Sequence, residues 1–136
     1  MGKVIEKIKL TNFTDPSKSL EIDALIDTGA TMLVLPQDVV EQLGLKKLQD
    51  TPVRYANNTT QIKSVYGIAI LEIRGRVGYF DALAEVEGSQ PLVGQIVLER
   101  LDLLVDPNKK VVMPNPNSPD APMMESLSPV IIYPDH

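Results

Sequence analysis

Asp27, Thr28 and Gly29 are the residues with the clearest chemical potential, and they follow an alternating apolar segment. Every second side chain of residues 20–26 is apolar, which predicts a strand with one buried face. Gly29 allows a sharp turn of the backbone, and residues 32–35 are apolar again. We therefore expect Asp27 in a tight loop between two buried segments. A carboxylate held there needs strong hydrogen-bond donors or shifts its proton affinity, and both suit a general acid or base.

With its flanks, this stretch resembles the active-site segment of the retroviral-type, retropepsin-like aspartic proteases. The first part of the resemblance is Asp-Thr-Gly-Ala at 27–30, then Val-Leu-Pro at 34–36, a short predicted helix and Gly-Leu at 44–45. The second part is Leu-Val-Gly at 92–94, followed by a run typical of a helix and by a strand at 103–105. The resemblance covers residues 4–113, which is most of the chain.

Gly94 takes its expected role from this resemblance, which implies that the strand ending in two apolar residues and glycine crosses beside the catalytic loop. Backbones approach closely only where a side chain is missing, so a Gly94 that faces the Asp27 loop is physically reasonable. The alternative is that Gly94 simply begins the following helix, because glycine also serves at N-cap positions.

Residues 53–62 predict two strand arms joined by a tight turn, because asparagines at 57 and 58 tolerate the positive φ of hairpin turns. The resemblance implies that this hairpin is the flap that covers the substrate. Retroviral flaps are usually rich in glycine and this turn has none, so we expect a stiffer or differently shaped lid. A plain surface hairpin is the alternative. The expected flap and substrate-binding residues are Tyr55, Ala56, Asn57, Asn58 and Thr59.

The rest of the chain predicts a mostly β fold. Further strands are expected at residues 4–10, 65–74, 76–86 and 111–113, and a short helix is expected to begin at Pro36 and to stop at Gly44. The resemblance implies one retropepsin-like lobe, with closed, barrel-like β-sheets and one or two short helices. Four carboxylates are expected on the solvent sides of the strands: Glu72, Asp81, Glu85 and Glu87.

Composition divides the chain into a protease-like domain at residues 1–113 and a proline-rich tail at residues 114–136. Residues 115–122 contain too much proline for a helix or an inner strand and predict an extended linker. The apolar residues 130–133 are expected either as a loose tail or as an edge strand that pairs with the sheet of its own or another subunit.

Composition also excludes several kinds of chemistry. The chain has no cysteine and one histidine, His136, which rules out thiol nucleophiles, disulfides, serine–histidine catalysis and histidine-rich metal sites. The net charge is −5 and the basic residues are scattered along the chain, so no positively charged surface that would bind nucleic acid is predicted. The first residues lack the apolar core of a signal peptide, and no apolar run reaches membrane-spanning length. We expect a cytoplasmic protein without a metal, cofactor, nucleic-acid or membrane partner.

Aspartic proteolysis needs two carboxylates that share a proton and hold one water molecule. The chain has one Asp-Thr-Gly and no room for a second lobe, so the missing aspartate must come from another copy. A symmetric homodimer would place Asp27 beside its symmetry mate on the two-fold axis. Two like charges at hydrogen-bonding distance do not both ionise, so the pair retains a proton and activity is expected to be best in mildly acidic solution.

The resemblance also implies roles for the neighbours of the aspartate. Thr28 would join the two loops across the axis, backbone groups of Gly29 would position the carboxylates, and Ala30 would line the substrate channel. Thr31 and Gln95 stand where retroviral enzymes commonly have an acid and an arginine, so the ion pair of those enzymes is not expected here.

Three functions remain open at this point. The first is a homodimeric aspartic endopeptidase that hydrolyses a peptide or protein substrate. The second is a non-catalytic peptide-binding or dimerisation module on the same fold, because fold does not determine function. The third is a monomeric β-domain in which Asp-Thr-Gly is only a turn. Peptide cleavage, saturable binding without cleavage, and the oligomeric state distinguish these functions.

Overall fold

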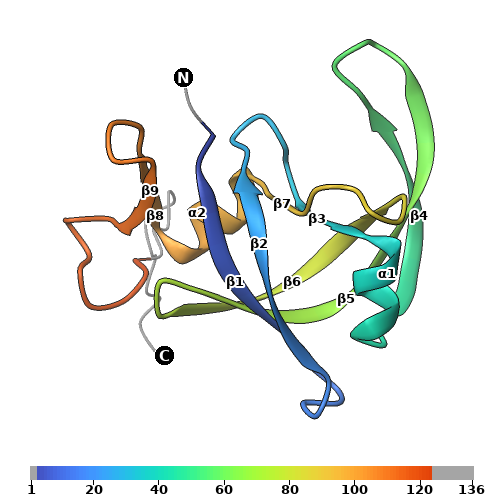
Figure 1. The fold of residues 1–136 in the computed structure, drawn as a ribbon, viewed down its shortest axis with the longest axis horizontal. Coiled ribbons are helices and arrows are strands. Elements are labelled where there is room, and N and C mark those ends of the chain that lie inside the picture. The colour runs from blue at the N-terminus through green and yellow to red at the C-terminus, as the bar shows by residue number, and fades with distance from the viewer. Residues whose placement is uncertain (1–2, 124–136) are drawn as a thin grey trace, which may run out of the picture.

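The computed structural model describes residues 3–123. Within this range the chain forms nine strands and two short helices (Figure 1). In chain order they are β1 (Ile5–Asn12), β2 (Ser19–Ile26), β3 (Leu33–Pro36), α1 (Gln37–Gln42), β4 (Lys46–Arg54), β5 (Thr60–Ile73), β6 (Arg76–Glu85), β7 (Leu92–Val93), α2 (Gln95–Leu101), β8 (Leu103–Asp106) and β9 (Val111–Pro114). Strands account for 52% of the structure and helices for 11%, so the predicted mostly β content is confirmed.

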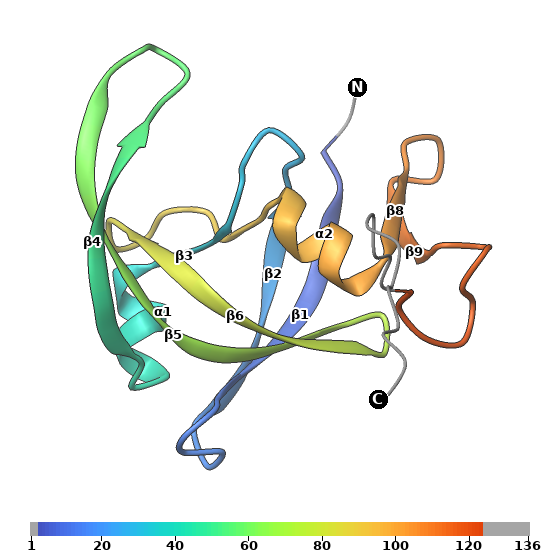
Figure 2. The same ribbon diagram turned by 180° about the vertical axis from the view of Figure 1, so that it is seen from behind.

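Seven strands form a sheet that closes on itself. Their order is β1-β2-β7-β3-β6-β5-β4, and an additional pairing of β1 with β5 closes the ring and leaves β4 attached outside it (Figures 1 and 2). The β2–β7 and β3–β6 pairs are parallel, whereas the β1–β2, β4–β5 and β5–β6 pairs are antiparallel. Strands β8 and β9 form a separate two-stranded sheet. The expected barrel-like single lobe with short helices is therefore confirmed.

The main core lies inside this ring. Alternation along β1 buries Ile8 and Leu10 completely, while Lys7 and Lys9 are exposed on the other face. Burial of such apolar side chains is the dominant favourable contribution to folding. The helices add further buried apolar side chains, namely Val39 and Val40 from α1 and Val97, Leu98 and Leu101 from α2.

Both helices are too short to be stable alone, and buried polar side chains from the sheet complete their C-terminal ends. The side-chain amide of Asn12, in β1, donates to the carbonyl oxygen of Leu43 at the end of α1 (2.8 Å). The guanidinium of Arg76, in β6, donates to the carbonyl oxygen of Leu101 at the end of α2 (2.9 Å). Each helix is thus attached to the barrel by its end as well as by its apolar face.

Local details of three predicted elements differ from expectation, although Gly44 (φ 64°) ends α1 as predicted. Pro36 is the N-cap of α1 and not its first residue, because it is still extended and pairs with Glu85 as the last residue of β3. Residues 46–52 were not predicted as a strand, and the strand expected from residue 65 already begins at Thr60. Most residues of β4 are exposed, so backbone pairing with β5, not a buried face, makes this segment a strand.

The predicted extended linker at residues 115–122 is wrong, because the segment turns back onto the end of α2. The carboxylate of Asp102 accepts hydrogen bonds from the hydroxyl of Ser118 and the side-chain amide of Asn115 (3.0 Å). These bonds hold the pKa of Asp102 below its ordinary value. The buried guanidinium of Arg76 also donates to the carbonyl oxygen of Ser118. Polar partners supplied by the domain therefore override the extended tendency of the prolines.

Two predictions about the end of the chain are not decided by these contacts. The edge strand predicted at residues 130–133 lies outside the described residues. The division into a domain at residues 1–113 and a tail at residues 114–136 stays a prediction.

Glu6 is a buried carboxylate that connects the two sheets. Its position on β1 turns it toward the core, and the residue is 8% exposed. One carboxylate oxygen accepts the backbone N–H of Val112, in β9, at 2.7 Å and the guanidinium of Arg74 at 3.0 Å. The separate β8–β9 sheet is thus hydrogen-bonded to the barrel through a charged acceptor.

Replacing Glu6 by alanine is expected to lower the free energy of unfolding by about 1–3 kcal/mol, because the buried N–H of Val112 would lose its acceptor. Urea denaturation followed by circular dichroism measures the change. Asp81→Ala removes an exposed carboxylate from β6 and is the control, with an expected change within about 0.5 kcal/mol. Equal stability of the two variants would show that Glu6 does not secure β9.

Candidate active site

Asp27 directly follows β2 and is half-buried at the start of the loop that leads to β3. Its carboxylate accepts the N–H of Gly29 (2.9 Å), and its carbonyl oxygen accepts the N–H of Ala30 (3.0 Å). Its own N–H donates to the carbonyl oxygen of Val93 in β7 (3.0 Å). Thr28 and Gly29 are exposed, and Ala30 is half-buried. The carboxylate therefore stands in a tight turn whose backbone is attached to the neighbouring strand.

Gly94 touches the backbone of this Asp27 loop. A Cβ added to it would lie 2.3 Å from the carbonyl oxygen of Met32, 2.7 Å from the carbonyl carbon of Thr31 and 2.8 Å from the carbonyl oxygen of Ala30. No side chain fits at such distances unless the loop moves. The φ of −88° is open to any residue, so the missing side chain, and not backbone freedom, is what glycine supplies here.

The first turn of α2 is hydrogen-bonded to the same loop. The N–H of Gln95 donates to the carbonyl oxygen of Ala30 (2.8 Å), and the N–H of Ile96 donates to that of Thr31 (3.0 Å). These two amides have no acceptor within their own helix. Gly94 is the N-cap of α2 as well as the point of close approach, so both interpretations of this glycine describe the structure.

The hairpin of β4 and β5 has its turn where the flap tip was predicted. The N–H of Tyr55 donates to the carbonyl oxygen of Thr59 (2.9 Å), and Ala56 lies at the exposed tip. Asn58 has a positive φ (66°), whereas Asn57 does not. The side-chain oxygen of Asn57 instead accepts the N–H (3.1 Å) and the hydroxyl (2.6 Å) of Thr59. Asparagine side chains thus close a turn that contains no glycine.

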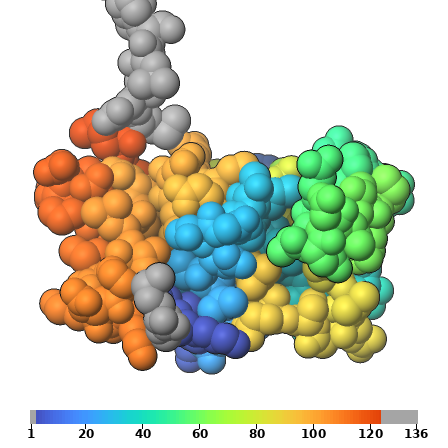
Figure 3. All heavy atoms as spheres, turned by 90° about the horizontal axis from the view of Figure 1, so that it is seen from above, coloured from blue at the N-terminus to red at the C-terminus, as the bar shows by residue number. Residues whose placement is uncertain are grey.

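The hairpin of β4 and β5, which we call the flap after its predicted role, and the Asp27 loop lie on the same face of the molecule. Both project to one side of the barrel in Figure 1, and Figure 3 shows that side with the two segments next to each other. A second apolar cluster joins them, because it includes Met32 from the loop and Val53 from the flap arm. Its buried members are Val34, Val65 and Leu83, and Leu92 also packs against them.

One polar group near the root of the flap was not predicted from the sequence. Glu85, predicted on the solvent side of β6, has a side chain that is 19% exposed and pairs with Lys63 (2.9 Å). Its other oxygen accepts the hydroxyl of Tyr55 (2.6 Å). The available signal was alternation, which places Glu85 on the same face as the buried Leu83, but only the folded sheet brings Lys63 opposite to it. The other predicted solvent-facing carboxylates are exposed, namely Glu72, Asp81 and Glu87.

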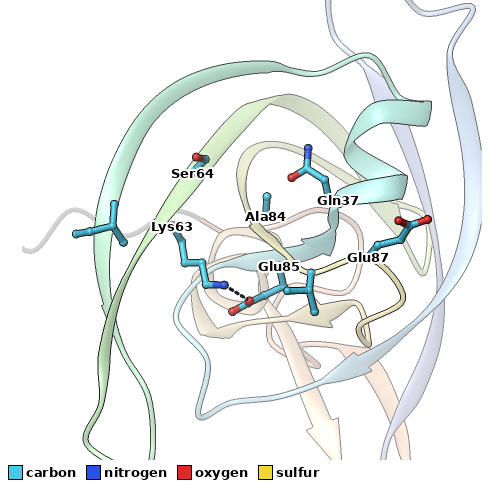
Figure 4. A pocket seen from close by; sticks show the side chains of 8 residues that line it. Gln37, Lys63, Ser64, Ala84, Glu85 and Glu87 are labelled. Atoms are coloured by element: carbon cyan, nitrogen blue, oxygen red, sulfur yellow. Dashed lines mark ion pairs between the residues drawn. The ribbon is translucent and has the colours of Figure 1, made fainter.

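A pocket of about 400 Å³ lies beside this group (Figure 4). It is lined by residues from α1, β5 and the end of β6, including Gln37, Ser64 and Ala84. Across residues 3–123, histidine, cysteine and acidic side chains nowhere gather in threes as metal ligands would. None of the helices in this part of the chain is long and apolar enough to cross a membrane.

The barrel and its loops define a single-lobe aspartic protease fold. The solved structure of EIAV protease in complex with the inhibitor HBY-793 matches with a TM-score of 0.56. The two sequences are 17% identical, and the match covers 72% of this chain and 86% of that chain. At this identity the likeness shows the fold alone.

The family follows from the sequence. The family profile described as "gag-polyprotein putative aspartyl protease" matches residues 18–100. The match spans more than half of the 136 residues and includes Asp27 and Gly94. The chain belongs to this family of retroviral-type aspartyl proteases, and the predicted retropepsin-like family is confirmed. No curated protein matches the sequence significantly.

Gly94→Ala is expected to lower the free energy of unfolding by about 1–3 kcal/mol or more, because the new Cβ must push the Asp27 loop aside. Thermal and urea unfolding measure the change. Gln95→Ala alters the next residue without adding an atom against the loop backbone, and its expected effect is within about 0.5 kcal/mol. A Gly94→Ala protein as stable as this control would contradict the close contact.

Proposed function

We propose that the protein is an aspartic endopeptidase that acts as a homodimer and hydrolyses peptide bonds with a water molecule held between two Asp27 carboxylates. The observation that carries the proposal is the placement of Asp27, on a loop bonded to β7 and α2 and on the same face as the flap. Membership of the aspartyl protease family supports it. One lobe supplies one carboxylate, and a symmetry-related copy supplies the other.

The chemistry proceeds in two steps. One carboxylate removes a proton from the water while the protonated partner gives its proton to the carbonyl oxygen, and the new C–O bond produces a tetrahedral diol. The C–N bond then breaks as one carboxyl group protonates the leaving nitrogen and the other takes back a hydroxyl proton, which restores the shared proton. The N–H of Gly29, 2.9 Å from the carboxylate of Asp27, stabilises the ionised form of this group whenever the other copy holds the shared proton.

An extended peptide is the substrate that this face suits best. Partly buried side chains of Met32, Val53 and Leu92 offer apolar surface to substrate side chains. The flap tip from Tyr55 to Thr59 covers the peptide, and the exposed Thr28 faces the loop of the second subunit. Location in the cytoplasm, without nucleic-acid or membrane partners, stays a prediction from composition.

Asp27→Asn is expected to lower kcat/KM for peptide cleavage at least about 100-fold between pH 3 and 7, because the pair loses its general base. Cleavage of an extended-peptide library followed by mass spectrometry measures this. Asp23→Asn changes an exposed aspartate on β2 and is expected to leave cleavage intact. Undiminished cleavage by Asp27→Asn would exclude the assigned role. Saturable peptide binding by a wild-type protein that never cleaves would indicate the non-catalytic module instead.

A tandem of two copies joined by a flexible linker tests the dimer. Activity per subunit of the unlinked protein is expected to fall on dilution, whereas that of the tandem is not, because the linker holds the second copy at high effective concentration. Asp27→Asn in one half of the tandem is expected to abolish cleavage as the double replacement does. Sedimentation as a monomer with concentration-independent activity per subunit would refute a shared site.

A further inference from the structure

The flap extends beyond the point where the pairing between β5 and β6 ends. The last paired residues toward the flap are Val65 in β5 and Leu83 in β6. Nearer the tip, residues 60–64 of β5 are paired with β4 alone. Beyond Val65 the two arms of the flap are thus paired with each other but not with β6. Backbone hydrogen bonds do not determine the height of the flap above the Asp27 loop.

The tip of the flap is also closed more firmly than a glycine-rich turn would be. The bond from Tyr55 to Thr59 and the bonds from Thr59 to the side chain of Asn57 tie both ends of the turn together. A hairpin closed in this way does not open from its tip, so its backbone hydrogen bonds open first at the root, where the pairing with β6 stops.

A single carboxylate spans the gap at that root. One oxygen of Glu85 pairs with Lys63, on the returning arm of the flap, at 2.9 Å, and the other accepts the hydroxyl of Tyr55, the residue that directly follows the outgoing arm, at 2.6 Å. The side chains of Lys63 and Glu85 are only 17% and 19% exposed. Figure 4 shows the ammonium group of Lys63 directed at Glu85 across the edge of the pocket. Both arms of the flap are therefore attached to the end of β6.

The charges of this group suit the acidic conditions that the proposed pair of aspartates requires. Burial raises the pKa of Glu85, but the bonds from Lys63 and Tyr55 outweigh it and hold that pKa below its ordinary value of 4.5. The hydrogen bond to Glu85 raises the pKa of Lys63, and burial together with the same carboxylate raises the pKa of Tyr55. Because the pKa of Glu85 is lowered, its attachment is present above pH 4.5 and is lost only as the pH falls through the lowered value.

We propose that Glu85 is a positioning residue of the flap, which it holds at the height needed to close over an extended peptide through its bonds to Tyr55 and Lys63. The proposal rests on the protease function proposed above for its consequence on substrate binding. Its structural part, the attachment of both arms to β6, is testable without any substrate.

Hydrogen exchange of the substrate-free protein tests the attachment. Tyr55→Phe and Glu85→Gln are expected to speed amide exchange across residues 53–64 by about two- to tenfold, because each weakens a bond that restrains the root. Exchange in β1 is expected to be unchanged, which separates a released flap from a destabilised fold. Unchanged exchange across residues 53–64 in both variants would overturn the proposal.

Control variants remove a tyrosine hydroxyl and a carboxylate at positions that are not hydrogen-bonded to Glu85. Tyr79→Phe takes a hydroxyl from an exposed tyrosine of β6, and Glu87→Gln neutralises an exposed carboxylate of the same pocket. Neither is expected to alter flap exchange. Lys63→Arg is expected to preserve the ion pair and near-normal exchange, whereas Lys63→Met is expected to behave like Glu85→Gln. A Lys63→Arg protein as mobile as Lys63→Met would contradict a role for the charge.

Steady-state kinetics test the consequence for substrate binding. Glu85→Gln is expected to raise KM by about two- to tenfold with kcat nearly unchanged. The reason is that a less restrained flap weakens the binding of the substrate ground state and of the transition state equally. A fall in kcat at constant KM would overturn the positioning role. If the wild-type protein cleaves no peptide, the protease function fails, while the exchange experiment still decides whether Glu85 holds the flap.

Discussion

The position of Asp27 depends on one contact between two backbones, which the missing side chain of Gly94 permits. The carbonyl groups of residues 30–32 lie where a Cβ of residue 94 would otherwise be. The same approach lets the loop accept the first amides of α2, so the helix and the loop stabilise each other. The proposed pairing of Asp27 with its symmetry mate would need this kind of support, because small displacements of reacting groups cost large factors in rate.

Buried polar side chains extend this support to the rest of the barrel. Asn12 and Arg76 complete the ends of the two helices, and Glu6 attaches the separate sheet to β1. Each lies at the end of an element, where backbone groups would otherwise be buried without partners. The apolar core therefore determines that the chain collapses, and these polar groups determine how helices six and seven residues long are oriented on it.

The flap combines a firm tip with arms that are not paired with β6 beyond Val65. Closure of the tip by Asn57 and a left-handed Asn58 takes the place of the glycines that such flaps usually carry. At the root, one carboxylate receives both arms, and its low exposure strengthens the attachment relative to a surface ion pair.

Much of this protein could be predicted from the order of its residues. Alternation in residues 20–26, the Asp-Thr-Gly that follows, and the apolar pair before Gly94 are local signals, and each led to an element that the structure contains. The mostly β fold and both helices follow from periodicity and from turn and cap residues, which act over a few positions. Residues 46–52 of β4 could not be predicted in this way, because these mostly exposed residues become a strand only by pairing with β5.

The tertiary structure alone decided which distant residues meet. The return of residues 115–118 to Asp102 and Arg76, and the meeting of Tyr55, Lys63 and Glu85, join positions that no local pattern relates. The sequence by itself determined that a carboxylate would stand at the end of a buried strand, because alternation and turn chemistry are local. Its support by Gly94 and the attachment of the β4–β5 hairpin to β6 depend on chain segments that meet only when the barrel closes, since contact between distant residues is a property of packing.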